Sequence, residues 1–490
     1  MTDWSVEMLL GIVRGLRAAP RRVGESARRG RDRPLAPRLG GSPAAALATA
    51  AQARAMRSTA LALGALLLGS RMAAPAPARA EDEPKKTLAE CLAIAIEQHP
   101  DLKAAQAAAQ VGHEQTWEAI STALPQINAI YGAQRRHTSA AASTAAQIGG
   151  SPSTFGFYST GITFSQILFD FGQSLAGIKA AQATERSLQA NADTARETVL
   201  FNVKQGYFNL LQASRLLAVA DENVRANQKH LDLANGRFDV GVATRFDITQ
   251  AEVLLINAQL AQLNARNNVA LARETFRNAL GIDGPLDFGI ADTLDVHDVH
   301  VDPDKAVDLA YDHRPELASL RLQEESVNGQ IVALERSYLP TINGNANYSY
   351  TGSSYPLENS WNFGATVNLS VFNGGLTTAQ VGAAKANLAQ LKAQEQSLRH
   401  QVALQVRQAV LNLAQASESI QVSEKGLQSA GENLAIAEGQ YSAGIGNIIA
   451  LTDAQALLTT AEGNNVQALA GYHTALAALE QATAQSFGGE

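Results

Sequence analysis

One stretch of this sequence occurs twice, and this duplication constrains the fold more than any other feature. Residues 237–252 read RFDVGVATRFDITQAE, and residues 439–454 read GQYSAGIGNIIALTDA. At an offset of 203 the aligned pairs include Phe238 with Tyr441, Gly241 with Gly444 and Thr249 with Thr452. In both copies a long helical pattern reaches a glycine, which allows the backbone to reverse at positive φ, and then restarts. Two such helical hairpins in one chain indicate an internal repeat.

Shorter motifs extend the repeat over most of the chain. HPDL at 99–102 recurs as RPEL at 314–317, and LPQIN at 124–128 recurs as LPTIN at 339–343, both at an offset of 215. The offset has fallen to 203 at Phe169 and Phe372, so the second copy lacks 12 residues in between. Connections tolerate such deletions better than regular elements do. We therefore expect a first repeat at 81–281, a connector at 282–304 and a second repeat at 305–487.

The helical patterns that enter the two hairpins are long and regular. Alternating steps of three and four residues from Leu200 to Phe238 give apolar residues at eight of twelve positions, as do the same steps from Ala403 to Tyr441. A period of 3.5 residues over this length predicts coiled-coil packing. No proline interrupts residues 173–238, so that helix would reach roughly 100 Å at 1.5 Å per residue.

Four segments alternate with the period of a β-strand. In residues 361–371 the apolar residues Trp361, Phe363, Ala365, Val367, Leu369 and Val371 alternate with small polar ones. Residues 127–134, 157–168 and 341–350 supply three weaker candidates. A half-buried soluble sheet gives this pattern, as does a tilted membrane strand of about 9–11 residues. Since about eight strands are needed to close a barrel, the membrane alternative requires several chains.

The N-terminal region has the features of a targeting segment. Residues 56–80 combine Arg57, an apolar run at 61–68 and an Ala-Arg-Ala cleavage site, which is typical of a signal peptide. Residues 1–55 are then either a disordered extension or the result of a misassigned start, and we favour the second. Residues 1–80 hold 13 of the 39 Lys and Arg and 4 of the 46 Asp and Glu, so 26 and 42 remain, a net charge of −16. Such acidity argues against nucleic-acid binding.

No motif for catalysis or for a cofactor stands out. The sequence lacks the nucleophile-elbow, phosphate-loop and HExxH patterns, so an enzyme has no positive support and we expect no cofactor. The only cysteine, Cys91, is expected to be a small apolar residue of a helix. The connector residues His297, His300, Asp302 and Asp304 have types that bind metals, but a solvated linker is the better interpretation because nothing fixes their geometry.

These motifs, in this order and duplicated, resemble the outer membrane efflux protein (TolC) family. The resemblance covers residues 83–487. Its motifs are TLAECLAIAIEQHPDL at 87–102, the LPQI and LPTI pair, LFDFGQ at 168–173, VFNGGL at 371–376, QGYFNLL at 205–211 and the two hairpin tips.

The resemblance implies an α+β fold that is mainly α, with four transmembrane strands and long coiled-coil helices in each chain. A homotrimer would form a twelve-stranded β-barrel in the outer membrane, continued across the periplasm by an α-helical barrel. The implied function is the passive exit duct of a tripartite efflux or type I secretion system, with a periplasmic adaptor and an inner-membrane transporter as partners. The sequence does not identify the cargo. The alternative is a periplasmic or surface coiled-coil scaffold protein without a pore.

By the same resemblance the gate would lie at the hairpin tips. Asp453 would form a ring of charges at the pore constriction, although an acid that favours a helix N-terminus is an equal alternative on the sequence alone. Asp247 and Tyr441 would link neighbouring tip helices in the closed state, while Asp247 could instead be a first-turn acid after a Thr244 cap.

The tips also depart from the family. Gly446 and Ala450 stand where the best-known member has an arginine and a second pore aspartate. We therefore expect a single charge ring and a different closing network to which Arg245 contributes. The expected adaptor contacts are small and apolar, with plain turn glycines as the competing explanation: Val240, Gly241, Val242, Ala443, Gly444 and Ile445.

Overall fold

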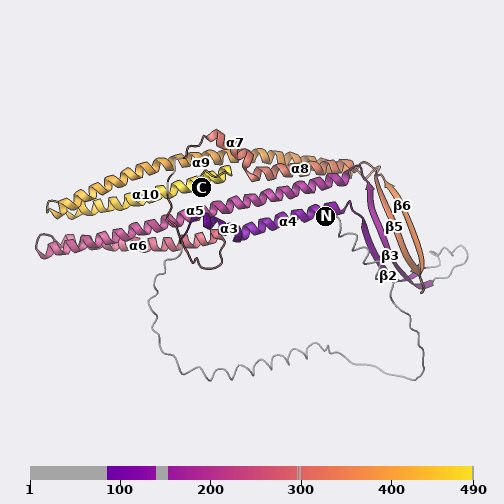
Figure 1. Cartoon of the computed structure of the whole chain (residues 1–490), viewed down its shortest axis with the longest axis horizontal. Coiled ribbons are helices and arrows are strands. Elements are labelled where there is room, and N and C mark those ends of the chain that lie inside the picture. The colour runs from indigo at the N-terminus through magenta and orange to yellow at the C-terminus, as the bar shows by residue number, and fades with distance from the viewer. Residues whose placement is uncertain (1–84, 139–152, 295, 297–298, 488–490) are drawn as a thin grey trace, which may run out of the picture. The chain divides into compact units, whose positions relative to one another are not determined.

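The computed structural model describes residues 85–138, 153–294, 296 and 299–487. The expectations for residues 1–55 and 56–80 lie outside this range. Within it, the chain consists mainly of long helices, with a four-stranded sheet at one end and two helical hairpin tips at the other (Figure 1).

The helix boundaries repeat at the two offsets found in the sequence. At an offset of 215, α3 (Leu88–Gln98) and α4 (Pro100–Ser121) correspond to α7 (Pro303–His313) and α8 (Pro315–Arg336). At an offset of 203, α5 (Gln173–Asp239) and α6 (Arg245–Leu280) correspond to α9 (Leu376–Ser442) and α10 (Ile448–Thr483). Helices α5 and α9 have 67 residues each without a break, which confirms the long helical patterns.

The four predicted strands pair into one antiparallel sheet. Its order is β2 (Gln126–Thr138), β3 (Ser153–Phe169), β5 (Thr341–Gly352) and β6 (Glu358–Asn368). The alternating pattern at residues 361–371 extends three residues beyond the strand, since β6 ends at Asn368. Within the described residues β2 and β6 each have one edge without a neighbouring strand.

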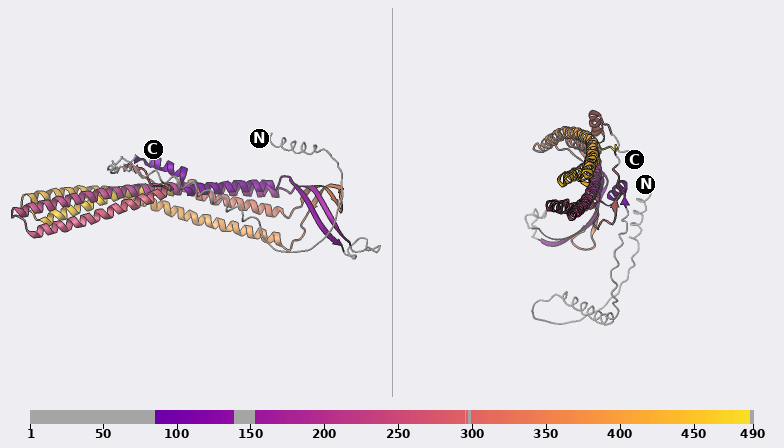
Figure 2. Two further views of the ribbon diagram at one scale, coloured as in Figure 1. Left: turned by 90° about the horizontal axis from the view of Figure 1, so that it is seen from below. Right: turned by 90° about the vertical axis from the view of Figure 1, so that its left-hand side faces the viewer.

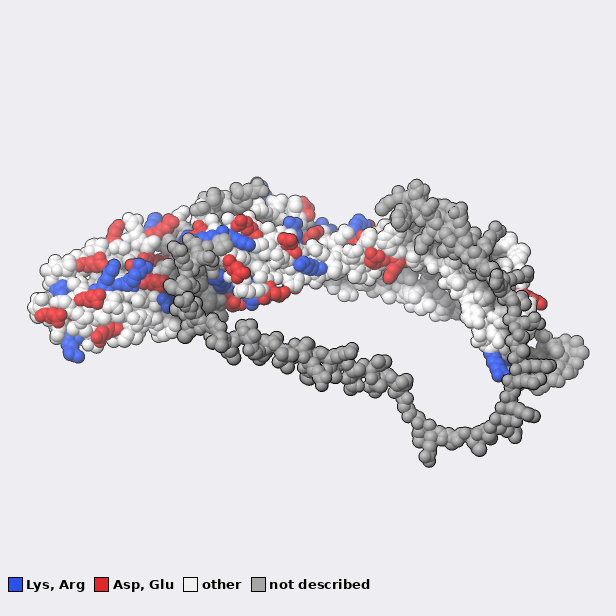
Figure 3. All heavy atoms as spheres, turned by 60° about the horizontal axis from the view of Figure 1, so that its bottom comes forward, with Lys and Arg blue, Asp and Glu red and all other residues white. Residues whose placement is uncertain are grey.

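The register gives this sheet one apolar and one polar face. Ile127, Phe164, Ala346 and Phe363 lie side by side across the four strands, and Asn128, Thr163, Asn347 and Asn362 form the adjacent polar row. The apolar face is not covered by the chain, since 66% of Trp361 and 77% of Phe363 are exposed. Charged residues in these strands are confined to the end far from the helices: Arg135, Arg136 and Glu358. Figure 3 accordingly shows charge spread over the helices and little on the visible part of the sheet.

All helices except α3 and α7 lie in one curved layer that is four helices wide along its length (Figure 2). Next to the sheet the neighbours are α4, α5, α8 and α9, and toward the tips they are α6, α5, α10 and α9. The long helices α5 and α9 belong to both halves. Helices α4 and α6 therefore lie at one lateral edge of the layer and α9 lies at the other.

Two apolar cores hold the layer together where its halves meet. The first packs α3 against α5 and α6 around Tyr207 and Phe276, and the second packs α7 against α9 and α10 around Tyr472 and Leu479. Cys91 is fully buried in the first core, which raises the pKa of its thiol to about 11 and confirms its expected packing role.

The expectation of a solvated connector at 282–304 is wrong for much of its length. Leu286, Phe288 and Leu294 are buried in the first core. Gly289–Ile290 (β4) pairs in parallel with Lys85–Lys86 (β1), and the Tyr207 hydroxyl donates a hydrogen bond to the Ala291 carbonyl at 2.6 Å. The apolar residues among the Gly and Asp residues cover Tyr207 and Phe276, so the connector is part of the core.

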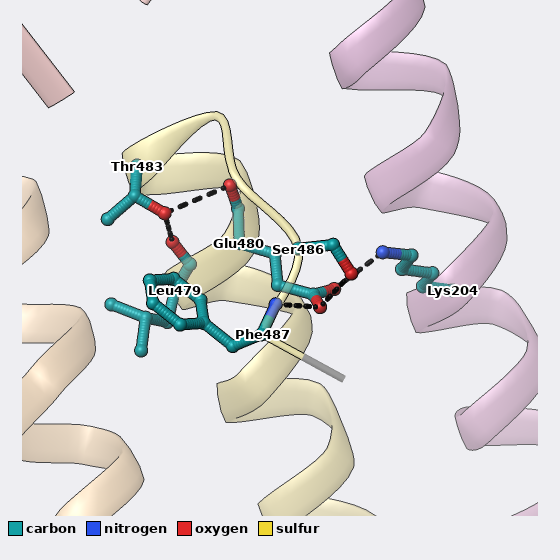
Figure 4. Close-up of polar contacts among 6 residues, drawn as sticks. All are labelled: Lys204, Leu479, Glu480, Thr483, Ser486 and Phe487. Atoms are coloured by element: carbon teal, nitrogen blue, oxygen red, sulfur yellow. Dashed lines mark hydrogen bonds and ion pairs between the residues drawn. The ribbon is translucent and has the colours of Figure 1, made fainter. Parts of the chain in front are cut away.

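An ion pair between α5 and α10 joins the two hairpins, and the C-terminal segment forms hydrogen bonds to its glutamate (Figure 4). Glu480 of α10 accepts hydrogen bonds from Lys204 Nζ of α5 at 2.5 Å, Ser486 Oγ at 3.1 Å and the Phe487 backbone nitrogen at 2.9 Å. The Phe487 side chain packs on the second core. Only 20% of the Lys204 side chain and 11% of the Glu480 side chain are exposed, so this ion pair is shielded from solvent.

None of the helices in the described residues has the length and apolarity that a bilayer-spanning helix requires.

Candidate gate at the helix tips

Each hairpin tip is a short turn built on a left-handed glycine. Gly241 has φ +77° and Gly444 has φ +79°, a conformation that other L-residues rarely adopt. The six expected adaptor contacts are all exposed on these turns, with Val240 at 72%, Val242 at 64% and Ile445 at 82%. The positive φ values show that both glycines are needed to form the turns. The exposed side chains of Val240, Val242 and Ile445 stay a candidate docking surface.

Asp247 caps the first residues of α6. Its Oδ2 accepts hydrogen bonds from the Thr244 backbone nitrogen at 2.8 Å and from Thr244 Oγ1 at 3.1 Å. This is the local role that the sequence offered as an alternative, and it orders the start of the helix. It leaves the carboxylate half-buried beside the second hairpin, where its charge helps to raise the pKa of Tyr441.

Tyr441 is the buried centre of the second tip. Only 4% of it is exposed, and it packs with Ile448 and Leu451 in a small apolar cluster. The aligned Phe238 in the first tip is 40% exposed, so the two tips differ in packing. Burial is the main cause that raises the pKa of Tyr441, with Arg237 opposing the shift.

Arg237 joins the two hairpins, a contact that sequence reasoning missed. Its Nη1 donates a hydrogen bond to the Tyr441 carbonyl, and its guanidinium lies 4.5 Å from the centre of the Tyr441 ring. We expected Arg245 to join the closing network, but within the described residues its side chain has no hydrogen bond or ion pair. Arg237 escaped notice because a cation in the last turn of a helix is already favoured by the helix dipole.

Asp453 lies exposed on α10. It is the sixth residue of the helix, whose first turn holds no acidic residue. Because the helix dipole acts on charges within the first turn, it does not explain this aspartate. The charge ring stays a prediction.

The connector does not form a metal centre in the described residues. Asp302 caps α7, because its Oδ1 accepts a hydrogen bond from the Asp304 backbone nitrogen at 3.0 Å. The Asp304 carboxylate forms an ion pair with Arg407 at 3.1 Å. His297, the first of the four residues considered for metal binding, lies outside the described residues.

Comparison with known proteins decides the family. The model of the "Outer membrane efflux protein" family matches residues 92–282 and 306–485, the two repeats of the chain. The chain belongs to the outer membrane efflux protein family.

Relatives agree with this assignment. The outer membrane efflux protein BepC of Brucella suis biovar 1 is 25% identical over 349 residues, which are 70% of this chain and 74% of BepC. The outer membrane protein TolC of Salmonella enteritidis is 26% identical over 320 residues, 62% of this chain and 64% of TolC. The fold resembles the Campylobacter jejuni CmeC outer membrane channel with a TM-score of 0.73 and 18% identity, covering 81% of this chain and 85% of CmeC. This outer membrane efflux protein is thus located in the outer membrane and extends into the periplasm.

Proposed function

We propose that three copies of this chain form a passive outer-membrane channel that is the exit duct of a tripartite efflux or type I secretion system. The observation that supports this most is the open sheet, which has an apolar face, a polar face and, among the described residues, two unpaired edges. Long exposed edges otherwise promote aggregation, and closure into a barrel removes them. Strands β2 and β6 run in opposite directions, so β6 of one copy can continue the antiparallel ladder with β2 of the next.

The assembly of three copies is taken from the family resemblance, and it agrees with the numbers of strands and helices in each copy. Four strands in each copy give twelve, above the roughly eight needed to close a barrel. The layer is also four helices wide, so strands and helices close with the same number of copies. The polar face with Asn128, Thr163, Asn347 and Asn362 would line the pore, and the apolar face would contact lipid.

The lateral edges of the helical layer are suited to meet in such an assembly. Helix α6 exposes an apolar stripe opposite its buried face, at Val253, Ile256, Leu260 and Leu263. Helix α9, at the other edge, exposes Leu404, Leu411, Val422 and Ile436. Contiguous apolar stripes on helices at solvent-exposed edges indicate contact surfaces.

In this assembly the tips would be the gate and the docking end. Three copies of Asp453 would form a ring of like charges, and Tyr441 with Asp247 and Arg237 would hold the tips together. Val240, Gly241, Val242, Ala443, Gly444 and Ile445 would contact a periplasmic adaptor, which joins the duct to an inner-membrane transporter. The chain would neither catalyse a hydrolysis nor actively pump the cargo.

Planar-bilayer recording of detergent-solubilised protein tests this proposal. We expect discrete conductance steps that multivalent cations block, from a species whose cross-linked mass is three chains. The alternative, a coiled-coil scaffold without a pore, predicts protein that salt washes from membranes as a monomer and that gives no conductance. That outcome would overturn the channel.

A further inference from the structure

The end of the sheet far from the helices carries basic residues of β2, at Arg135, Arg136 and His137. In the sequence of residues 126–169 and 341–368, which holds the four strands and their turns, the two arginines are the only Lys or Arg and Glu358 is the only acid. This end is therefore positively charged, although residues 81–490 together have a net charge of −16. A local charge opposite to that of the whole chain attracts anions.

The two arginines lie on opposite faces of the sheet, because successive side chains of a strand alternate. Arg135 shares the apolar face with Ile127, and Arg136 shares the polar face with Asn128. The side chains agree with this register, since the Arg136 guanidinium lies 5.7 Å from the ring centre of Phe157 on the polar face. Arg135 is exposed and forms no hydrogen bond or ion pair in the part of the chain that the structure describes.

His137 supplies a second donor on the apolar face, two residues beyond Arg135. Its Nδ1 lies 2.7 Å from Thr154 Oγ1 of β3, which is its partner in the ladder. When the Thr154 hydroxyl donates this hydrogen bond, the ring hydrogen is on Nε2, and Nε2 becomes a donor. Two residues span about 6.6 Å along a strand, so both side chains can reach one phosphate group.

The same face is aromatic just below these two residues. Tyr131 is 69% exposed, and Tyr158 contacts Tyr355, which is 66% exposed, at a ring distance of 5.5 Å. In membrane β-barrels aromatic side chains gather where the apolar band meets the lipid headgroups. Arg135 and His137 are therefore expected at the level of the headgroups.

The dimensions of the sheet agree with this level. Val367 pairs with Ile342 at the end of the apolar face near the helices, and Tyr158 pairs with Gly352 at the aromatic end, ten residues further along β5. Ten residues measure about 33 Å along a strand, or about 25 Å across a membrane at a tilt of about 40°. A barrel's apolar band has this height. Arg135 pairs two residues beyond Tyr158 in β3 and so lies outside the band.

We propose that Arg135 and His137 bind the phosphate group of a lipid headgroup in the outward-facing leaflet, with the acyl chains along the apolar face. This rests on the proposed channel, which puts the hairpin tips in the periplasm and this end of the sheet outside. The Arg135 guanidinium would donate two parallel hydrogen bonds to phosphate oxygens, and His137 Nε2 would donate a third. Glu358 does not compete, because it shares the polar face with Asn362.

Native mass spectrometry of the solubilised full chain with lipid A, an acylated disaccharide bisphosphate, tests the proposal. The same lipid without its phosphates is the matched ligand. We expect lipid A to bind more tightly, and Arg135→Gln to bind it roughly tenfold more weakly. Arg136→Gln removes the same charge from the next residue on the opposite face and should bind like the unmodified protein. Millimolar inorganic phosphate should not displace the lipid.

Three results would overturn the site: equal binding of the two lipids, equal binding by the two arginine variants, or displacement of lipid A by inorganic phosphate. The measured masses show whether each variant still assembles. Arg135→Lys keeps the charge without the paired hydrogen bonds and should bind with intermediate strength should Arg135→Gln fail to fold. Conductance is recorded separately. Protein that conducts but does not distinguish the lipids refutes only the lipid site, and protein that binds lipid A but does not conduct refutes only the channel.

Discussion

At the scale of single residues, Arg237 joins the two tips. It combines a charge-assisted hydrogen bond to the Tyr441 carbonyl with a cation–π contact to the same residue. Gly446, where the best-known relative has an arginine, cannot contribute such a contact. In this chain the arginine that contacts the opposite tip comes from the first hairpin.

Replacing Arg237 by methionine should loosen the closed tips. The two contacts together are worth about 2 kcal/mol, which would raise the open population roughly 30-fold if they are lost on opening. Open probability in planar bilayers measures the effect. Arg245→Met removes the same charge from an exposed residue of the neighbouring helix and should leave gating unchanged. Equal behaviour of the two variants would mean that Arg237 does not hold the gate.

Asp453→Ala should weaken block by multivalent cations, because it would remove three charges from one ring. We expect the concentration for half-block by a trivalent cation to rise more than tenfold. Asp239→Ala, an equal charge change at the exposed end of α5, serves as the control. Unchanged block in Asp453→Ala would remove this residue from the constriction.

Glu462 of α10 gives a pH-dependent prediction, because burial, and then the charge of Glu222, raises its pKa. Because its pKa is raised in the folded protein, its carboxylate costs stability once the pH exceeds the ordinary value for glutamate. Glu462→Gln should therefore raise the thermal midpoint at pH 7–8, and the gain should shrink as the pH falls and the native residue becomes protonated. Melting curves across pH measure it, and a gain that grows toward acid would contradict the assignment.

At the scale of elements, the repeat in the sequence predicted the helices well. The patterns at 173–238 and 361–371 correspond to α5 and β6, because burial on one side imposes a regular spacing of apolar residues. The connector was predicted poorly. Its Leu286 and Phe288 carry no periodicity, and only the surrounding core shows that they are buried.

The apolar stripe on α6 predicts a contact between copies. Leu260→Asp places a charge at its centre and should dissociate the trimer in detergent while leaving the chain helical, because Leu260 faces away from the core. Asn268→Asp puts the same charge on the exposed flank of the helix and should leave the assembly intact. Size-exclusion chromatography with light scattering distinguishes them. A trimeric Leu260→Asp would exclude this stripe from the interface.

At the scale of the whole molecule, the candidate gate could be only partly predicted because it depends on contacts between the two hairpins. The sequence located the turns and the exposed Asp453, which are local properties. It could not show that Tyr441 is buried while the aligned Phe238 is 40% exposed, or that Arg237 reaches across to Tyr441. Tyr441 is buried because it packs with Ile448 and Leu451 of α10 and against Arg237 of the first hairpin.

The assembly itself can be tested at the two open edges of the sheet. Cysteine at Ala129 in β2, combined in turn with cysteine at alternate positions of β6 from Asn359 to Val367, should cross-link adjacent copies at one register. The native Cys91 should not interfere, since it is fully buried and its raised pKa of about 11 keeps it a thiol. Within one chain β3 and β5 separate β2 from β6, so any disulfide must join two copies.

The pattern of products then decides how the sheet is closed. A ring of three gives linked dimers and trimers on a non-reducing gel and nothing larger, whereas an open edge-to-edge stack gives a continuing ladder. Each single-cysteine variant should remain a monomer, because β2 meets β6 and not a second β2. Monomers at every β6 position would mean that the edges do not pair between copies, and the twelve-stranded barrel would have to be abandoned.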